Sequence, residues 1–140
     1  MTTIKMPVYV AINIKTTADS TLQDFKFKID DWQDTYDDRE ANEPEYDSQI
    51  DRWQDALDRL EEKIGDATEL ADDYEEWVDN LGLDTIMSTT SYIDIEIDKD
   101  GLLDIIKRLR DFNQEYRGLS KIIKEIEKIA KTIKTYEVKQ

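Results

Sequence analysis

Residues 47–81 read DSQIDRWQDALDRLEEKIGDATELADDYEEWVDNL, and the pattern of this stretch sets the architecture of the whole chain. Its apolar side chains recur at alternating steps of three and four residues, a spacing that keeps them on one side of a helix. These seam residues are Ile50, Trp53, Leu57, Leu60, Ile64, Ala67, Ala71, Tyr74, Val78 and Leu81. The stretch predicts one long helix, and Gly82 followed by Leu83 is typical of a left-handed helix end.

The opposite side of this helix carries a row of carboxylates at helical spacing. They are Asp51, Asp55, Asp58, Glu62, Glu69, Asp72, Glu76 and Asp79. One element therefore supplies both an apolar stripe for the core and a line of anions for the surface.

Residues 21–41 show the same division and predict a first helix. Ser20 is suited to its N-cap, and Gln23 completes a capping-box pattern. The apolar seam is Leu22, Phe25, Ile29, Trp32 and Tyr36, and the acids on the other side include Asp30, Asp34 and Asp37. Because only residues 42–45 connect this helix to the next, we expect the two helices to be antiparallel neighbours.

Two stretches have the alternation of strands. Apolar residues occupy every second position from Ile4 to Ile14, with Pro7 indicating an edge position. Ile93, Ile95 and Ile97 alternate with polar residues and predict a second half-buried strand.

The turn at residues 98–101 leads into the last predicted helix, with Asp98 or Asp100 as its cap. From Leu102 to Thr135 the three-four steps pass Gly118 without a change of phase, which predicts one long helix. We expect five lysines on it to face the acidic second helix: Lys121, Lys124, Lys128, Lys131 and Lys134. Residues 135–138 are rich in β-forming residues and predict a short third strand.

These elements give an α+β, mostly helical fold in a single domain, residues 1–140. The order β-α-α-β-α predicts an antiparallel bundle of three long heptad-patterned helices with a small two- or three-stranded sheet. The core should contain Trp53, Leu57, Leu60, Ile105, Leu109, Phe112 and Ile126. Apolar residues beside the seams, such as Leu70 and Ile122, make a homodimer a possible assembly.

Charge is concentrated in one part of the 140-residue chain, whose net charge is −15. Residues 19–84 contain 24 acidic and 6 basic residues, and 16 of the acids are Asp. A surface of this kind repels nucleic acid and anionic membranes, so we expect neither as a direct partner. With no apolar run long enough for a signal peptide or a bilayer span, we expect a cytoplasmic protein.

Enzyme chemistry and cofactors are not expected. The chain has no Cys and no His, which removes disulfides, thiolate ligands and the usual general base. Glu96, Asp98, Asp100 and Gly101 resemble the start of a calcium loop, but its twelfth position is Lys107 instead of Glu. Carboxylate pairs such as Glu69 with Asp72 could hold magnesium only if several converged on a sheltered site, whereas the pattern places them on the outward face.

The acidic face carries the functional hypothesis. Asp is a poorer helix former than Glu but holds its carboxylate closer to the backbone, as a rod of fixed anions requires. We expect a small acidic binding protein that mimics the charge of nucleic acid and inhibits a basic DNA- or RNA-handling protein, as phage-type antagonists of restriction or CRISPR enzymes do. Its partner-binding residues would be Asp30, Asp34 and Asp37 with the eight acids of residues 51–79. The alternative is a coiled-coil structural or adaptor protein that is acidic for solubility only.

Overall fold

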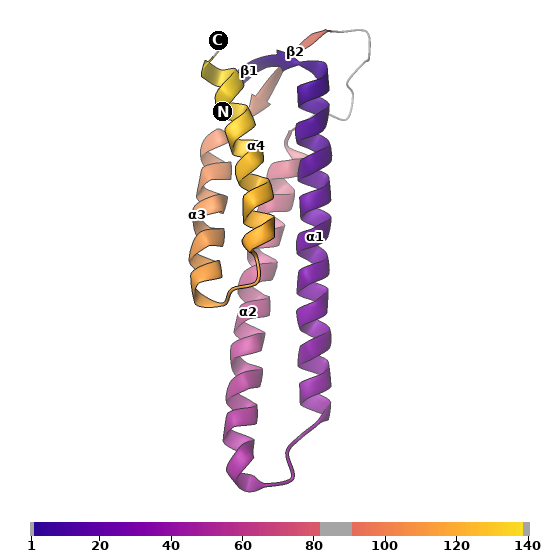
Figure 1. Cartoon of the computed structure of the whole chain (residues 1–140), viewed down its shortest axis with the longest axis vertical. Helices are drawn as coiled ribbons and strands as arrows, with labels where there is room; N and C mark the ends of the chain where they lie inside the picture. Colours follow the sequence, from indigo (N-terminus) through magenta and orange to yellow (C-terminus); the bar gives the residue numbers. More distant parts are fainter. Residues whose placement is uncertain (1, 82–90, 139–140) are drawn as a thin grey trace.

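The computed structural model describes residues 2–81 and 91–138, and these ranges form two strands and four helices (Figure 1). In chain order they are β1 (Thr2–Pro7), α1 (Val8–Ala41), α2 (Asp47–Asp79), β2 (Tyr92–Ile97), α3 (Lys99–Glu115) and α4 (Ser120–Val138). The mostly helical α+β class that the sequence predicts is confirmed, with the last predicted helix divided in two.

The helices differ in length, and this difference shapes the molecule. The first two, α1 and α2, have 34 and 33 residues, whereas α3 and α4 have 17 and 19. Each of the two long helices therefore extends about 50 Å. Each helix runs antiparallel to the next; α3 packs on α2, and α4 packs on α3 and α1. At the end near the sheet the chain is therefore a four-helix bundle, and beyond the turn between α3 and α4 only α1 and α2 continue (Figure 1).

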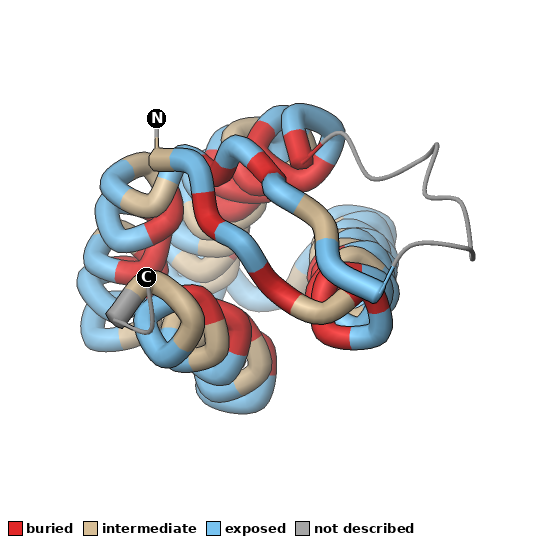
Figure 2. Tube along the Cα trace, turned by 90° about the horizontal axis from the view of Figure 1, so that it is seen from above, coloured by how far each residue is buried: buried red, intermediate tan, exposed pale blue. Residues whose placement is uncertain are grey.

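The two strands pair antiparallel, with Ile4 opposite Ile95 and Met6 opposite Ile93. They cross the end of the bundle, as the view from above shows (Figure 2). Ile4, Met6, Ile95 and Ile97 are buried on the face toward the helices, while their neighbours in the sequence are exposed or partly buried. The predicted alternation is confirmed for both strands within these bounds.

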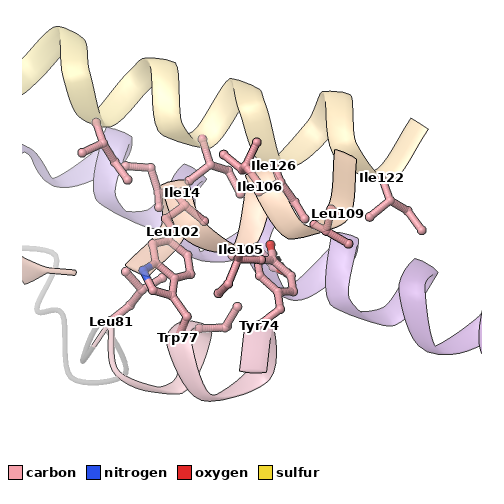
Figure 3. Packing of buried hydrophobic residues seen from close by; sticks show 14 of the residues in the cluster. Ile14, Tyr74, Trp77, Leu81, Leu102, Ile105, Ile106, Leu109, Ile122 and Ile126 are labelled. Atoms are coloured by element: carbon pink, nitrogen blue, oxygen red, sulfur yellow. Dashed lines mark hydrogen bonds between the residues drawn. The ribbon is translucent and has the colours of Figure 1, made fainter. Parts of the chain in front are cut away.

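The core lies where four helices meet. Tyr74 and Trp77 of α2 lie against α3, and Ile122 and Ile126 of α4 are buried in the same cluster (Figure 3). Five of the seven predicted core residues are buried: Leu57, Ile105, Leu109, Phe112 and Ile126. The other two, Trp53 and Leu60, are only partly buried. Trp53 lies toward the free end of the hairpin, where its indole N–H donates to the Arg39 carbonyl of α1 at 2.6 Å, and Leu60 lies where α3 ends.

The prediction of a strand to Ile14 and a helix start near Ser20 is wrong, because α1 begins at Val8. Pro7 ends the strand and precedes the helix with φ −59° and ψ 143°. Helical spacing decides what is buried after it: Ala11, Ile14, Ala18, Thr21 and Phe25 follow in three-four steps. Ile12, which would share the buried face of a strand with Ile14, is 47% exposed.

The prediction of one helix through Gly118 is also wrong. The third helix, α3, ends at Glu115, and the backbone reverses through Arg117 (φ 65°) and Gly118 (φ 101°), both in the left-handed region. The Asn113 side chain spans the turn: its Oδ1 accepts from the Leu119 N–H at 2.9 Å, and its Nδ2 donates to Ser120 Oγ at 3.1 Å. The three-four spacing of apolar residues continues across the turn because α4 runs antiparallel to α3 and also turns its apolar side toward the core.

Two further expectations fail because of this reversal. The last helix, α4, packs on α1 and α3, so its five exposed lysines do not line α2 as predicted. Residues 135–138 are the end of α4 and form no third strand. The predicted helix end at Gly82 and Leu83 lies outside the described residues.

Candidate functional site

The free end of the long hairpin is strongly acidic. We define the acidic arm as residues 30–58, which comprise the end of α1, the connection 42–46 and the start of α2. It contains 12 acidic and 2 basic residues, and Leu57 is the one buried residue within it. Most residues of the arm are therefore exposed, and its charge is strongly negative.

The structure places all eleven predicted partner-binding carboxylates on the surface. It divides them into two groups that the sequence does not distinguish. Asp30, Asp34, Asp37, Asp51, Asp55 and Asp58 belong to the arm. Glu62, Glu69, Asp72, Glu76 and Asp79 continue along α2 beside the four-helix part. Whether either group binds a partner stays a prediction.

Ion pairing leaves these carboxylates available. All eleven lie in the described ranges, and none of them forms a salt bridge there. Asp37 and Asp58 each accept one hydrogen bond from a glutamine on their own helix, at 3.1 and 3.0 Å. The salt bridges between helices use other acids, such as Glu75 with Lys26 at 3.0 Å. Within the described part of the chain, no Lys or Arg therefore pairs with the candidate carboxylates of the arm.

The pKa of Tyr36, which lies on the seam of α1 in the arm, is shifted by the surrounding carboxylates. Its partial burial raises the pKa of the phenol, and the carboxylates of Glu61, Glu40 and Asp58 raise it further. Two of these acids belong to α2 and one to α1. Negative groups from both helices thus act on one point of the arm.

The arm joins the four-helix part at a cluster of aromatic and cationic residues, which we call the collar: Trp32, Arg59, Lys63, Phe112 and Tyr116. Trp32 stacks on Phe112 with ring centres 6.0 Å apart, and Phe112 meets Tyr116 at 5.0 Å. The Lys63 ammonium lies 4.0 Å from the centre of the Trp32 ring, and the Arg59 guanidinium lies 5.1 Å from that of Tyr116. Such cation–π contacts contribute about 0.5–1 kcal/mol each at partly exposed sites.

Hydrogen bonds and charge complete the collar. Arg59 donates to the Glu115 carbonyl at 2.8 Å, and the Tyr116 hydroxyl donates to Asp66 at 3.2 Å. Partial burial lowers the pKa of Lys63, with the charges of Lys28 and Arg59 adding to the effect. The three-four pattern correctly placed Trp32 and Tyr116 on seams, but no sequence signal pointed to the two cations that cover them.

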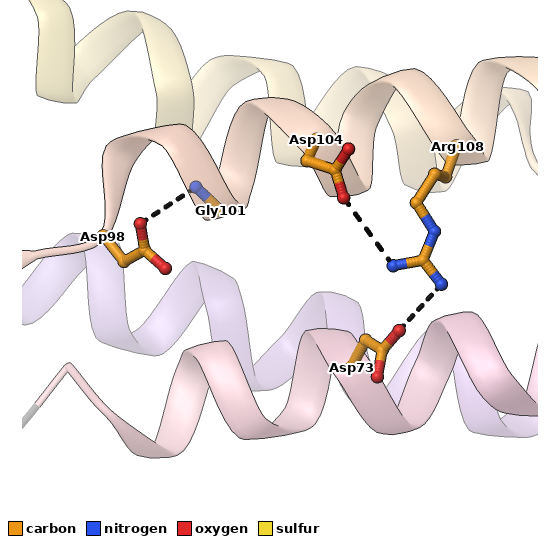
Figure 4. A network of polar contacts seen from close by, with 5 residues as sticks. All are labelled: Asp73, Asp98, Gly101, Asp104 and Arg108. Atoms are coloured by element: carbon orange, nitrogen blue, oxygen red, sulfur yellow. Dashed lines mark hydrogen bonds and ion pairs between the residues drawn. The ribbon is translucent and has the colours of Figure 1, made fainter.

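A second polar contact ties α3 to α2 along the four-helix part. Arg108 of α3 donates to Asp73 of α2 at 2.7 Å and lies 3.8 Å from Asp104 (Figure 4). Asp98 accepts from the Gly101 N–H at 2.9 Å, which makes it the N-cap of α3. This carboxylate of the calcium-like stretch thus caps a helix, and of the two caps that the sequence predicts, Asp98 and Asp100, it is Asp98 that accepts the bond.

Neither a metal centre nor a membrane segment emerges from the described residues. No group of three or more carboxylates among them is arranged to hold a metal ion. None of the described helices is long and apolar enough to cross a bilayer.

Comparison of the chain with models of protein families, with curated proteins and with solved structures gives no match.

Proposed function

We propose that this protein binds a basic nucleic-acid-handling protein through the acidic arm and inhibits it by occupying its nucleic-acid groove. The observation that carries the proposal is the projecting arm, with 12 acids against 2 bases and none of its candidate carboxylates in a salt bridge with the residues that the structure describes. Solubility alone requires an excess of only a few charges spread over the surface. Here 12 of the 34 acidic residues of the chain lie on the part with the least core.

Charge explains how such an arm would find its partner. Grooves that bind nucleic acid are lined with Lys and Arg, which meet regularly spaced phosphates. A rod of carboxylates presents a similar field, so encounter is accelerated by steering and slowed by added salt. Because the arm consists of two helices, its carboxylates are held on a regular backbone and are not on a flexible tail.

The alternative function, a coiled-coil adaptor, needs an apolar seam for a second chain. Most of the α2 seam from Leu57 onward is buried against this chain's own helices. Partly buried seam residues remain in the arm, among them Ile50 and Trp53. An adaptor would therefore have to dock through these apolar residues of the arm, and its binding would change little with salt.

The test begins with capture. The protein is immobilised, exposed to a cell extract at low salt and eluted with rising salt, and the eluted proteins are identified by mass spectrometry. The proposal predicts nucleases or other nucleic-acid enzymes in the high-salt fractions. It also predicts that the free protein displaces labelled duplex DNA or RNA from the captured partner.

Two triple variants distinguish the effect of the arm on binding from the effect of net charge. Changing Asp34, Asp51 and Asp55 to Asn neutralises the arm, and changing Glu96, Asp111 and Glu115 to Gln or Asn neutralises three exposed acids elsewhere. Both variants lose three carboxylates from a chain whose net charge is −15, so their net charges are equal. At about 0.5 kcal/mol for each exposed pair, the arm variant should bind about tenfold more weakly at low salt.

The control triple should bind like the wild type, with at most a small loss from long-range charge. Equal affinities of the two triples at both salt concentrations would show that the arm is not the binding element.

A further inference from the structure

The solvent face of α1 carries an aromatic ring next to the acidic arm. Phe27 is 60% exposed, whereas Phe25 and Phe112 are buried in the core. It lies on a groove of about 440 Å³ between α1 and the beginning of α4. Its ring is therefore available to a molecule that approaches this side of the arm.

Two carboxylates flank the ring on its own helix. Asp24 precedes Phe27 by three residues and Asp31 follows it by four, so all three share one helix face. Both acids line the groove, both are exposed, and neither forms a salt bridge within the described chain. The face continues without interruption into the acids of the arm.

The α4 side of the groove and Lys28 contribute the other charges. Glu125 lines the groove and pairs with Lys128 at 3.1 Å. Lys28 and Lys121 also line it, so the groove holds three carboxylates and two ammonium groups. Thr21, Gly118 and Ile122 complete its walls. With three carboxylates and two ammonium groups, the net charge of the groove attracts an ion only weakly. An occupant must therefore gain from contact with the aromatic ring as well as from the carboxylates beside it.

We propose that this groove receives an arginine side chain of the basic partner, an inference that rests on the proposed function. A guanidinium is planar and weakly hydrated, and it stacks on an aromatic face while its N–H groups donate to carboxylates at its edge. A lysine ammonium is a hydrated point charge that gains less from the ring. Phe27 thus gives the acidic surface a preference for arginine that carboxylates at the same spacing lack.

The experiment uses two peptide probes, nona-arginine and nona-lysine, which carry the same charge. Their affinities for the full-length protein are measured by fluorescence anisotropy at low and moderate salt. The quantity of interest is the ratio of the two dissociation constants, because it cancels the charge attraction that both peptides share.

Phe27→Ala is the test variant and Tyr9→Ala its control. Tyr9 is 73% exposed and belongs to the same helix. It precedes Phe27 by five full turns, which places it on the same face and about 27 Å away. Phe27→Ala should reduce the arginine preference about two- to fivefold, the range expected for one exposed cation–π contact, with nona-lysine binding weakened less than nona-arginine binding. Tyr9→Ala should keep the wild-type ratio, and circular dichroism verifies that both variants are folded.

The outcomes distinguish this inference from the proposed function. If Phe27→Ala keeps the wild-type ratio, or if Tyr9→Ala lowers it equally, the arginine site is refuted while the arm proposal stands. If the arm triple variant binds both peptides as tightly as the wild type, the arm proposal itself is contradicted. Failure of the wild type to bind either peptide contradicts both.

Discussion

Replacing Gly118 with Ala tests the turn on which the shape of the molecule depends. Gly118 lies between α3 and α4 with φ 101°, a conformation that residues with a Cβ rarely adopt. A Cβ at this position would also lie 3.0 Å from Cζ2 of Trp32 in the collar. We expect backbone strain of about 1–2 kcal/mol, with the displacement of the Trp32 ring bringing the total loss of unfolding free energy to about 1–3 kcal/mol.

Gly65→Ala is the matched control, with the opposite sign. Gly65 lies inside α2 on the exposed side, and a Cβ added there meets no atom within 4 Å. Ala is the better helix former, so this change should stabilise the protein by about 0.5–1 kcal/mol. The same substitution therefore has opposite effects at two glycines that the sequence pattern places inside helices.

Urea denaturation followed by circular dichroism measures both variants, with equal slopes of the transition showing that the folded state is comparable. If residues 102–135 formed one continuous helix, Gly118→Ala would stabilise the protein as Gly65→Ala does. A neutral or stabilising effect of Gly118→Ala would thus refute the turn and, with it, the projection of the acidic arm.

Three further changes test the helix cap, the core and the response to pH. Asp98 accepts the hydrogen bond of the Gly101 N–H. Asp98→Ala should therefore lower the free energy of unfolding by about 0.5–2 kcal/mol in urea denaturation, and Asp98→Asn should recover most of the loss. Leu109 is fully buried and Leu60 only partly buried. Leu109→Ala should cost about 2–5 kcal/mol and Leu60→Ala clearly less; equal losses would contradict the difference in packing. Burial raises the pKa of the Tyr74 hydroxyl. The unfolded chain therefore loses this proton first, so stability should fall above about pH 10, and Tyr74→Phe should show a shallower fall in alkaline unfolding curves.

Apolar periodicity was sufficient to predict most of the fold. Both α2 and β2 follow from three-four and two-residue spacing, and the cap at Asp98 follows from its place before a helix. Periodicity was misleading where the same residues fit both the two-residue spacing of a strand and the three-four spacing of a helix. Val8, Val10, Ile12 and Ile14 alternate like a strand, yet the buried set in this stretch is helical and includes Ala11, which a strand would expose.

The spacing of apolar residues does not predict the turn at Gly118. Because of this error, the sequence did not predict that an acidic arm extends beyond the four-helix part. A continuous helix from Leu102 to Thr135 would have covered the whole α1–α2 hairpin, so the predicted carboxylates would have formed one even face. Two short helices leave about the last third of the hairpin bare. Sequence therefore predicted which carboxylates are exposed, but the division into an arm and a body depends on a reversal of the backbone by Arg117 and Gly118.

The end of α3 and the start of α4 also give the molecule a step in cross-section. Below the step the chain is two helices side by side, and above it the section doubles (Figure 1). Each helix is about 10–12 Å thick, and residues 33–41 of α1 extend about 14 Å beyond this step. A cleft that admits two helices but not four would receive the molecule to that depth and no further. The depth to which the arm enters the cleft would then be set by the turn between α3 and α4, independently of how deep the cleft is.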